Sequence, residues 1–280
     1  METANNKTTD FIKVIRNLGM YIGAVIGAGF ASGQEPLQFF ASYGYAGIMG
    51  TVLVIVLFSW YGTMFMELGN RLKTTSHRDI LTYLCGKFAG NIFDWVLTFF
   101  LFGVIAIMIS GGGSALNQYF GVNIFIGKIL ITVISVITVI LGFSSALNVL
   151  GFLSPLMVIT TLAISIITLF SNLDGLSTVG ETIGNIELNS ATPYWWSSMF
   201  IYVSYCVFPV ITALATVGYS ESDVKVVRKS GVVGGLALGV SVFFMVLALL
   251  SSIGKVYAYE IPFLEIARQL NPVIGFIFAI

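Results

Sequence analysis

The sequence predicts an all-α, polytopic membrane protein, and its composition carries this prediction. Of the 280 residues, 57% are hydrophobic and only 9% are charged, whereas a soluble domain carries about 25% charged residues. The mean hydropathy is +0.95. So few charges cannot cover a water-soluble globule of this size, because such a surface needs a mixed coat of charged side chains. The composition therefore excludes a soluble enzyme, a nucleic-acid-binding protein and a disordered chain.

Stretches without charged residues predict the individual spans, because a helix needs about 20 apolar residues to cross the hydrocarbon core. They predict seven full spans and the start of an eighth, near 11–33, 46–69, 94–120, 124–142, 146–170, 194–218, 231–254 and 272–280. The serine-containing cluster from Gly142 to Asn148 is typical of a turn between the fourth and fifth spans. The eighth stretch stops while still apolar, so we expect residues 1–280 to form one transmembrane domain that is truncated at its C-terminal end.

The positive charges predict the orientation of these spans. With the N-terminus inside, ten of the thirteen Lys and Arg residues lie on the inner side, and Lys128, Lys255 and Arg268 lie outside. Inner loops carry the excess of positive charge, so we expect a cytoplasmic N-terminus. Residues 79–91 are predicted to form a short amphipathic helix on the inner face of the membrane, before the third span.

The first span contains a glycine-rich stretch that predicts a break. Residues 23–36 read GAVIGAGFASGQEP; glycine costs about 1 kcal/mol relative to alanine inside a helix, and Pro36 suits the first turn of a new helix. We expect an inner half-helix up to about Ile26, an unwound stretch from Gly27 to Gly33, and an outer half-helix that opens around Ser32. The alternative is an unbroken helix, because glycines four residues apart also fit close helix packing.

The sixth span contains a second candidate break at Pro209, near its centre. A proline inside a helix removes one hydrogen bond and collides with the carbonyl four residues earlier, here that of Tyr205. Taken alone, a simple kink is an equally good interpretation. However, breaks in spans one and six are typical of an inverted repeat of five plus five spans, with a binding site at the membrane midplane. We therefore expect Pro209 to act as a hinge.

The run from Gly23 to Phe40, GAVIGAGFASGQEPLQFF, resembles the signature of the YkvI-type bacterial membrane proteins, and residues 205–218 are similar as well. These proteins are regarded as amino-acid permeases of the amino acid–polyamine–organocation superfamily, which shares the leucine-transporter fold. The resemblance implies a secondary transporter in the bacterial plasma membrane that moves a small amino acid or related zwitterion by alternating access. The alternative is a ligand sensor of the same fold, similar to germinant-receptor subunits, that binds without transporting.

The same resemblance implies a substrate site between the two broken spans. The substrate carboxylate would meet backbone N–H groups of the first break, which follows the physics of anion binding at a helix start. The ammonium group would meet carbonyls freed around residues 204–208, and aromatic side chains would select the substrate side chain, although aromatic residues are also typical of ordinary helix packing. The implied substrate-binding residues are Gly27, Ala28, Gly29, Phe30, Ala31, Ser32, Gly33, Tyr202, Ser204, Tyr205 and Phe208.

Three acidic residues near the predicted spans have distinct expected roles. Glu35 is the only carboxylate between Asp10 and Glu67. It either faces water as a favourable charge at a helix start or faces the cavity as a group for proton or ion coupling. Glu67 is expected to pair with Arg71, one helical turn later, and Asp94 is expected to cap the third span.

The remaining residue types exclude most other chemistry. His77 is the only histidine and lies in the basic loop, so we expect no zinc site and no histidine proton relay. No span combines the side chains of an intramembrane protease, so we expect no enzyme, no catalytic residue and no cofactor; the coupling ion, sodium or a proton, stays open. Gly111–Gly113 in the third span is either a hinge or a close crossing with the first span, and we expect packing. The predicted partners are the lipid bilayer and a small substrate, and the oligomeric state stays open.

Overall fold

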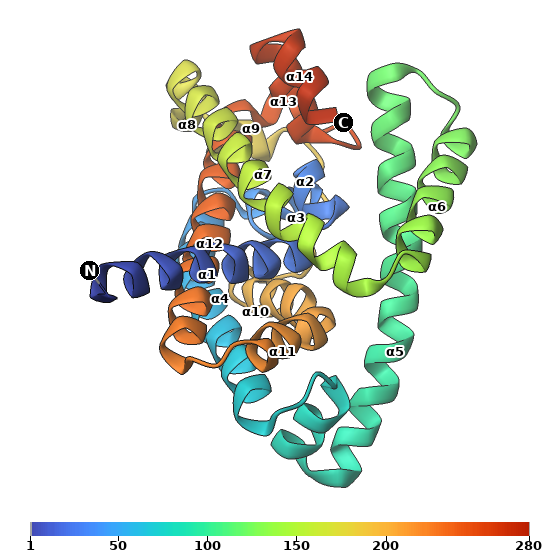
Figure 1. The fold of residues 1–280 in the computed structure, drawn as a ribbon. Coiled ribbons are helices and arrows are strands. Elements are labelled where there is room, and N and C mark those ends of the chain that lie inside the picture. The colour runs from blue at the N-terminus through green and yellow to red at the C-terminus, as the bar shows by residue number, and fades with distance from the viewer. Residues whose placement is uncertain (1, 280) are drawn as a thin grey trace.

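The computed structural model describes the backbone of residues 2–279, and all of their side chains except those of residues 2–9, 28, 143–152, 277 and 279. Every regular element in this part of the chain is a helix (Figure 1). The elements are α1 (Glu2–Val25), α2 (Ala28–Ser32), α3 (Gln34–Phe39), η1 (Ala41–Tyr43), α4 (Tyr45–Leu72), α5 (His77–Phe120), α6 (Ile124–Ile140), α7 (Phe143–Ser171), α8 (Leu173–Ser177), α9 (Val179–Gly184), α10 (Trp195–Val207), η2 (Phe208–Val210), α11 (Ile211–Ser220), α12 (Val224–Val256), α13 (Pro262–Leu270) and α14 (Pro272–Ala279).

Five helices of the described chain are long and apolar enough to cross a membrane. They are α4, α5, the Leu153–Ser171 part of α7, the combined segment Trp195–Ser220, and α12, and they correspond to the second, third, fifth, sixth and seventh predicted spans. Helix α6, at the fourth predicted span, is apolar but has only 17 residues. The first predicted span, 11–33, is divided between α1 and α2, and α3 follows directly after it. The chain therefore has the expected fold class of an all-helical, polytopic membrane protein.

The centre of the molecule is the contact between α4 and α12, with α1, α10 and α11 around it (Figure 1). Glycines bring these two helices close together. A Cβ atom on Gly231 would lie 2.5 Å from Cα of Thr63, and a Cβ atom on Gly239 would lie 2.5 Å from Cα of Ile55. Non-bonded carbon atoms normally stay about 3.5–4.0 Å apart, so only glycine permits this approach. The glycine-rich face of α12 is a small-residue packing surface of the kind that holds membrane helices together.

Helices α5 and α6 pack on each other beside this centre (Figure 1). A Cβ atom on Gly112 would lie 3.0 Å from Cγ1 of Ile131, and one on Gly113 would lie 2.6 Å from Cγ of Lys128. The glycine triplet is therefore a packing surface, as expected, but its partner is α6 and not the first span. The reason is the short connection 121–123, which turns α6 back along the end of α5.

A break at Gly86 divides α5 into two helices. Gly86 has φ 78° and ψ 169°, which glycine adopts without the strain that a side chain would cause. The predicted amphipathic helix, 79–91, is therefore only partly correct: the break at Gly86 divides it into the end of a helix that covers 77–85 and the start of a second helix at residue 87. Asp94 therefore lies inside a helix and does not cap one, so this expectation is wrong. Its carboxylate instead accepts from Nε2 of His77, 2.8 Å away.

Candidate binding site between two broken helices

The first break in the structure lies at Ile26 and Gly27, between α1 and α2. Gly27 is extended, with φ −114° and ψ −177°, and the next helical hydrogen bond runs from the Ala31 N–H to the Gly27 carbonyl, 3.0 Å. The expected break is confirmed, but the expected unwinding from Gly27 to Gly33 is wrong. The five residues of α2 form a helical turn within that stretch, because the chain resumes its hydrogen-bond pattern directly after Gly27.

The second half of this segment begins at Gly33, which has φ 78° and ends α2 in the left-handed conformation. The hydroxyl of Ser32 accepts a hydrogen bond from the Gln34 N–H, 3.2 Å, and so satisfies a free donor at the start of α3. A Cβ atom on Gly33 would lie 2.8 Å from Cβ of Phe263 in α13. Glycine is therefore required here by the backbone conformation and by the neighbouring helix.

The second break lies at Pro209, where the 3₁₀ turn η2 separates α10 from α11. Proline has no N–H, so it donates no helical hydrogen bond to the carbonyl of Tyr205. The Phe208 N–H still donates to the Ser204 carbonyl. The break is thus a tightened turn and not an unwound loop, and the Ser204 carbonyl remains part of the helix.

A cavity of about 250 Å³ joins the two breaks, and we call it the break cavity. Its wall combines both breaks with one face of α5 and one side chain of α3. Its lining residues are Ala24, Val25, Ile26, Gly27, Glu35, Val104, Met108, Tyr205, Cys206, Pro209 and Val210. A Cβ atom on Gly27 would lie 2.5 Å from Cε of Met108, so this glycine lets α5 approach the first break. Ligand sites are typically apolar clefts with a few polar groups, and the break cavity fits that description.

Glu35 is the charged group of the break cavity. Its side chain is half-buried and turns back over α2, so that a Cβ atom on Gly29 would overlap the Glu35 carboxylate. Tyr205, from the second break, lines the same cavity as this carboxylate. None of the ion pairs among the described side chains includes Glu35. Within the described part of the chain, the carboxylate thus lies in the cavity between the two breaks without a cationic protein partner.

The structure brings four of the predicted residues to the break cavity: Gly27, Glu35, Tyr205 and Pro209. The backbone of Ala28 belongs to α2, and its side chain lies outside the described residues. Gly29, Phe30, Ala31, Ser32 and Gly33 are also part of the α2 segment but do not line the cavity.

The other predicted aromatic and polar residues lie elsewhere in the structure. Phe30 and Tyr202 are buried in the core, where the Tyr202 ring stands edge-on to Phe40 with centroids 5.0 Å apart. Ser204 and Phe208 line a larger groove of about 520 Å³ at the side of α10. Phe30 and Tyr202 therefore take part in ordinary helix packing, which was the alternative to a role in substrate selection.

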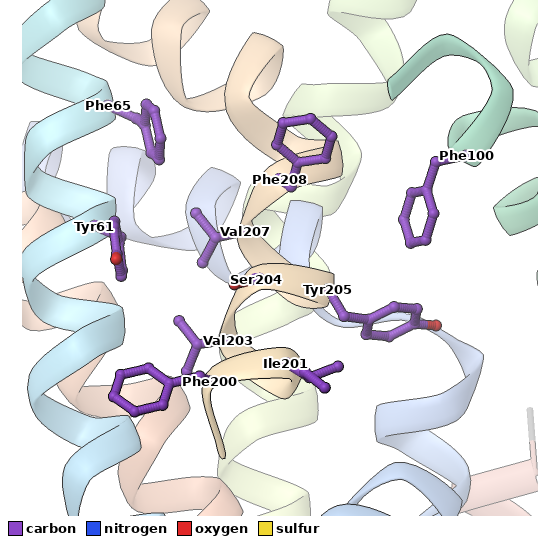
Figure 2. Close-up of a pocket in the computed structure, with 10 residues that line it drawn as sticks. All are labelled: Tyr61, Phe65, Phe100, Phe200, Ile201, Val203, Ser204, Tyr205, Val207 and Phe208. Atoms are coloured by element: carbon purple, nitrogen blue, oxygen red, sulfur yellow. The ribbon is translucent and has the colours of Figure 1, made fainter. Parts of the chain in front are cut away.

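Figure 2 shows the larger groove, with Tyr61 and Phe65 of α4 on one side, Phe100 of α5 on the other, and α10 side chains between them. Tyr205 belongs to both the groove and the break cavity, and its ring stands edge-on to Phe100 with centroids 5.7 Å apart. The lining of the groove contains no charged side chain. It therefore offers little to orient a polar ligand, and we place the candidate site in the break cavity.

Several lining residues of the break cavity were not predicted from the sequence. Val104 and Met108 are four residues apart and so share a face of α5, but such spacing does not say which helix that face meets. Cys206 lies three residues before Pro209, and its position next to a candidate break is a signal that could have identified it. Cys206 is buried.

A polar network closes the bundle at the end that contains the α4–α5 and α11–α12 connections. Glu221 is 3% exposed; its carboxylate accepts from Nζ of Lys13, 3.4 Å, and from Nδ2 of Asn17, 3.5 Å. Asn70 of α4 donates to the carbonyls of Gly218 and Glu221. We call these contacts the Glu221 network; they tie α1, α4 and the end of α11 together.

A second set of ion pairs lies at the same end. Glu67 pairs with Arg71, 3.1 Å, as expected, and also with Arg228 of α12, 2.7 Å. His77 contacts Asp94 and, through Nδ1, the hydroxyl of Thr212, 2.9 Å. These pairs attach α12 to α4 and α5 to α11.

The opposite end of the molecule is covered by α13 and the connection before it (Figure 1). Phe263 of α13 is fully buried and lies against Gly33 of the first broken segment. Nε2 of Gln34 donates to the Tyr259 carbonyl, 3.1 Å, and Gln118 of α5 exchanges two hydrogen bonds with the backbone of Ile261, 3.1 and 3.0 Å. The α2–α3 segment is therefore held between α5 and α13.

Comparisons with known proteins agree with a membrane protein. No protein-family profile and no solved structure matches the chain. It is 27% identical over 254 residues to the uncharacterized membrane protein YkvI of Bacillus subtilis strain 168, which covers 88% of this chain and 69% of that protein. It is 29% identical over 244 residues to the uncharacterized protein YyaD of the same strain, with 87% and 68% covered. The chain is thus a multi-pass membrane protein that is similar along most of its length to these two Bacillus proteins.

Proposed function

We propose that the protein is a secondary transporter that moves a small amino acid or related zwitterion across the bacterial plasma membrane by alternating access. The observation that carries this proposal is the break cavity. It lies between two interrupted helices that are five spans apart in the predicted order, and its wall includes Glu35 from the first broken segment and Tyr205 from the second. Irregular backbone at membrane depth is tolerated where it lines a cavity, and discontinuous helices of this kind form the sites of many transporters.

The proposal includes the leucine-transporter arrangement of five plus five spans, with the N-terminus in the cytoplasm. In this arrangement the broken segments α1–α3 and α10–α11 move against α5 and α6. The two ends of the molecule suit such a movement, because different contacts hold them: the Glu221 network at one end and the contacts of α13 at the other. Each end can open while the other set of contacts persists.

Uptake into proteoliposomes tests the proposal directly. The purified protein is reconstituted, a panel of labelled amino acids is offered, and sodium and pH gradients are imposed separately. We expect accumulation of at least one small amino acid, and its dependence on one gradient identifies the coupling ion. Saturable binding without flux or exchange would identify a ligand sensor instead. Absence of binding, exchange and uptake under every condition would overturn both functions.

A further inference from the structure

The charge inside the break cavity indicates the chemistry of its ligand. Its lining contains three ionisable groups, the Glu35 carboxylate, the Tyr205 phenol and the Cys206 thiol, and none of the lining residues is Lys, Arg or His. Two basic side chains of the neighbouring helices are engaged elsewhere: Lys13 with Glu221 and His77 with Asp94. The wall of the cavity thus presents one acid and no base.

A carboxylate away from bulk water is costly unless it is paired and hydrogen-bonded. Tyr205 lines the same cavity as Glu35, but its hydroxyl supplies no positive charge. The carboxylate also occupies the space beside Gly29, at the first turn of α2. A ligand carboxylate brought to the same turn would stand next to it and be repelled, whereas a ligand cation would be attracted.

We propose that Glu35 binds the cationic nitrogen of the substrate, so that the break cavity takes a small ligand with a primary amine. This inference rests on the proposed function and adds the group that recognises the substrate. Gly29 is a positioning residue, because its missing side chain leaves room for the Glu35 carboxylate.

The size and the remaining wall of the cavity fit a small amine. About 250 Å³ corresponds to roughly eight water molecules at about 30 Å³ each, which suits a compact ligand better than a long one. Val104, Met108 and Val210 supply apolar surface away from the carboxylate. Glu35 would thus bind the ammonium group of the ligand, and these apolar side chains would contact its carbon chain in a different part of the cavity.

Binding measurements with three chemical forms of the same ligand test this inference. The purified protein in lipid nanodiscs is titrated with glycine, alanine, valine and leucine, each as the free amino acid, as its amide and as its N-acetyl derivative. The amide keeps the cation and loses the carboxylate, whereas the N-acetyl form keeps the carboxylate and loses the cation. We expect free amino acids and amides of at least one side chain to bind, and their N-acetyl forms to bind at least about tenfold more weakly.

The variant Glu35→Gln is expected to bind both amine-bearing forms at least about tenfold more weakly, because it removes one partner of a charge pair. Glu35→Asp keeps the charge and should retain part of the affinity. Glu181→Gln, at an exposed position of α9, is the matched control and should bind as the unaltered protein does. The three chemical forms are compared on the unaltered protein, so the result does not depend on whether Glu35→Gln folds.

The possible outcomes separate this inference from the proposed function. Two results would overturn the role of Glu35 while uptake still supports a transporter. The first is that an N-acetyl form binds as tightly as its free amino acid. The second is that Glu35→Gln binds the amine-bearing forms as tightly as the unaltered protein does. If Glu35→Gln binds normally but loses accumulation driven by a pH gradient, Glu35 carries a proton and the inference is likewise overturned. Binding of no panel member by the unaltered protein would overturn the inference and the proposed function together.

Discussion

Replacement of Gly239 by alanine tests the reasoning that glycine holds the centre of the bundle together. The Cβ atom of Gly239→Ala would lie 2.5 Å from Cα of Ile55 and 3.0 Å from its Cβ. Ordinary contact requires about 3.5–4.0 Å, so α12 and α4 must separate locally by roughly 1.0–1.5 Å. Overpacking of this kind costs about 1–3 kcal/mol. We therefore expect the variant to be less stable than an alanine substitution made where there is room.

Gly103→Ala is the matched control, because nothing lies within 4 Å of a Cβ atom at that position of α5. Both variants gain the same helix propensity, about 1 kcal/mol for alanine over glycine, so their difference isolates the overlap with α4. At roughly 2–4 °C per kcal/mol, Gly239→Ala should melt about 2–12 °C below the control.

The assay is the apparent melting temperature of the purified proteins in one detergent, followed by tryptophan fluorescence and by loss of the monodisperse peak after heating. Membrane proteins often unfold irreversibly, so both variants are heated at the same rate. Equal melting temperatures, or a higher one for Gly239→Ala, would refute the claim that α4 and α12 are in contact through these glycines.

Three further predictions concern the site and the two ends of the molecule. Gly29→Ala should displace the Glu35 carboxylate and weaken ligand binding at least about tenfold without lowering the melting temperature. Unchanged ligand affinity would contradict the positioning role of Gly29. Lys13→Met should loosen the Glu221 network and raise the rate at which a maleimide labels Cys206, measured in a protein whose other cysteine is replaced by serine. An unchanged labelling rate would show that this network does not restrict access to Cys206. Gly33→Ala should destabilise more than Gly121→Ala. Both glycines are in the left-handed conformation and carry its cost of about 1–2 kcal/mol, but only Gly33 also faces Phe263, whereas nothing lies within 4 Å of a Cβ atom on Gly121. Equal losses, measured as melting temperatures, would argue against the α13 contact.

The sequence by itself determined the class of protein and the places where two helices are interrupted. Both are local properties: hydropathy over about 20 residues decides whether a helix can lie in lipid, and glycine or proline decides where its hydrogen bonds fail. The breaks at Gly27 and Pro209 and the pair Glu67–Arg71 followed from such local patterns.

Only the tertiary structure decided what surrounds these breaks. The sequence did not reveal that Met108 of α5 lies against Gly27 or that the Glu35 side chain returns over Gly29, because the spacing of residues on one helix does not specify its neighbours. The glycine triplet of α5 was likewise expected to pack against the first span, whereas it packs against α6. Contacts between distant segments depend on how whole helices pack, so the acid that faces the break cavity became a candidate for ligand recognition only when both breaks were seen together.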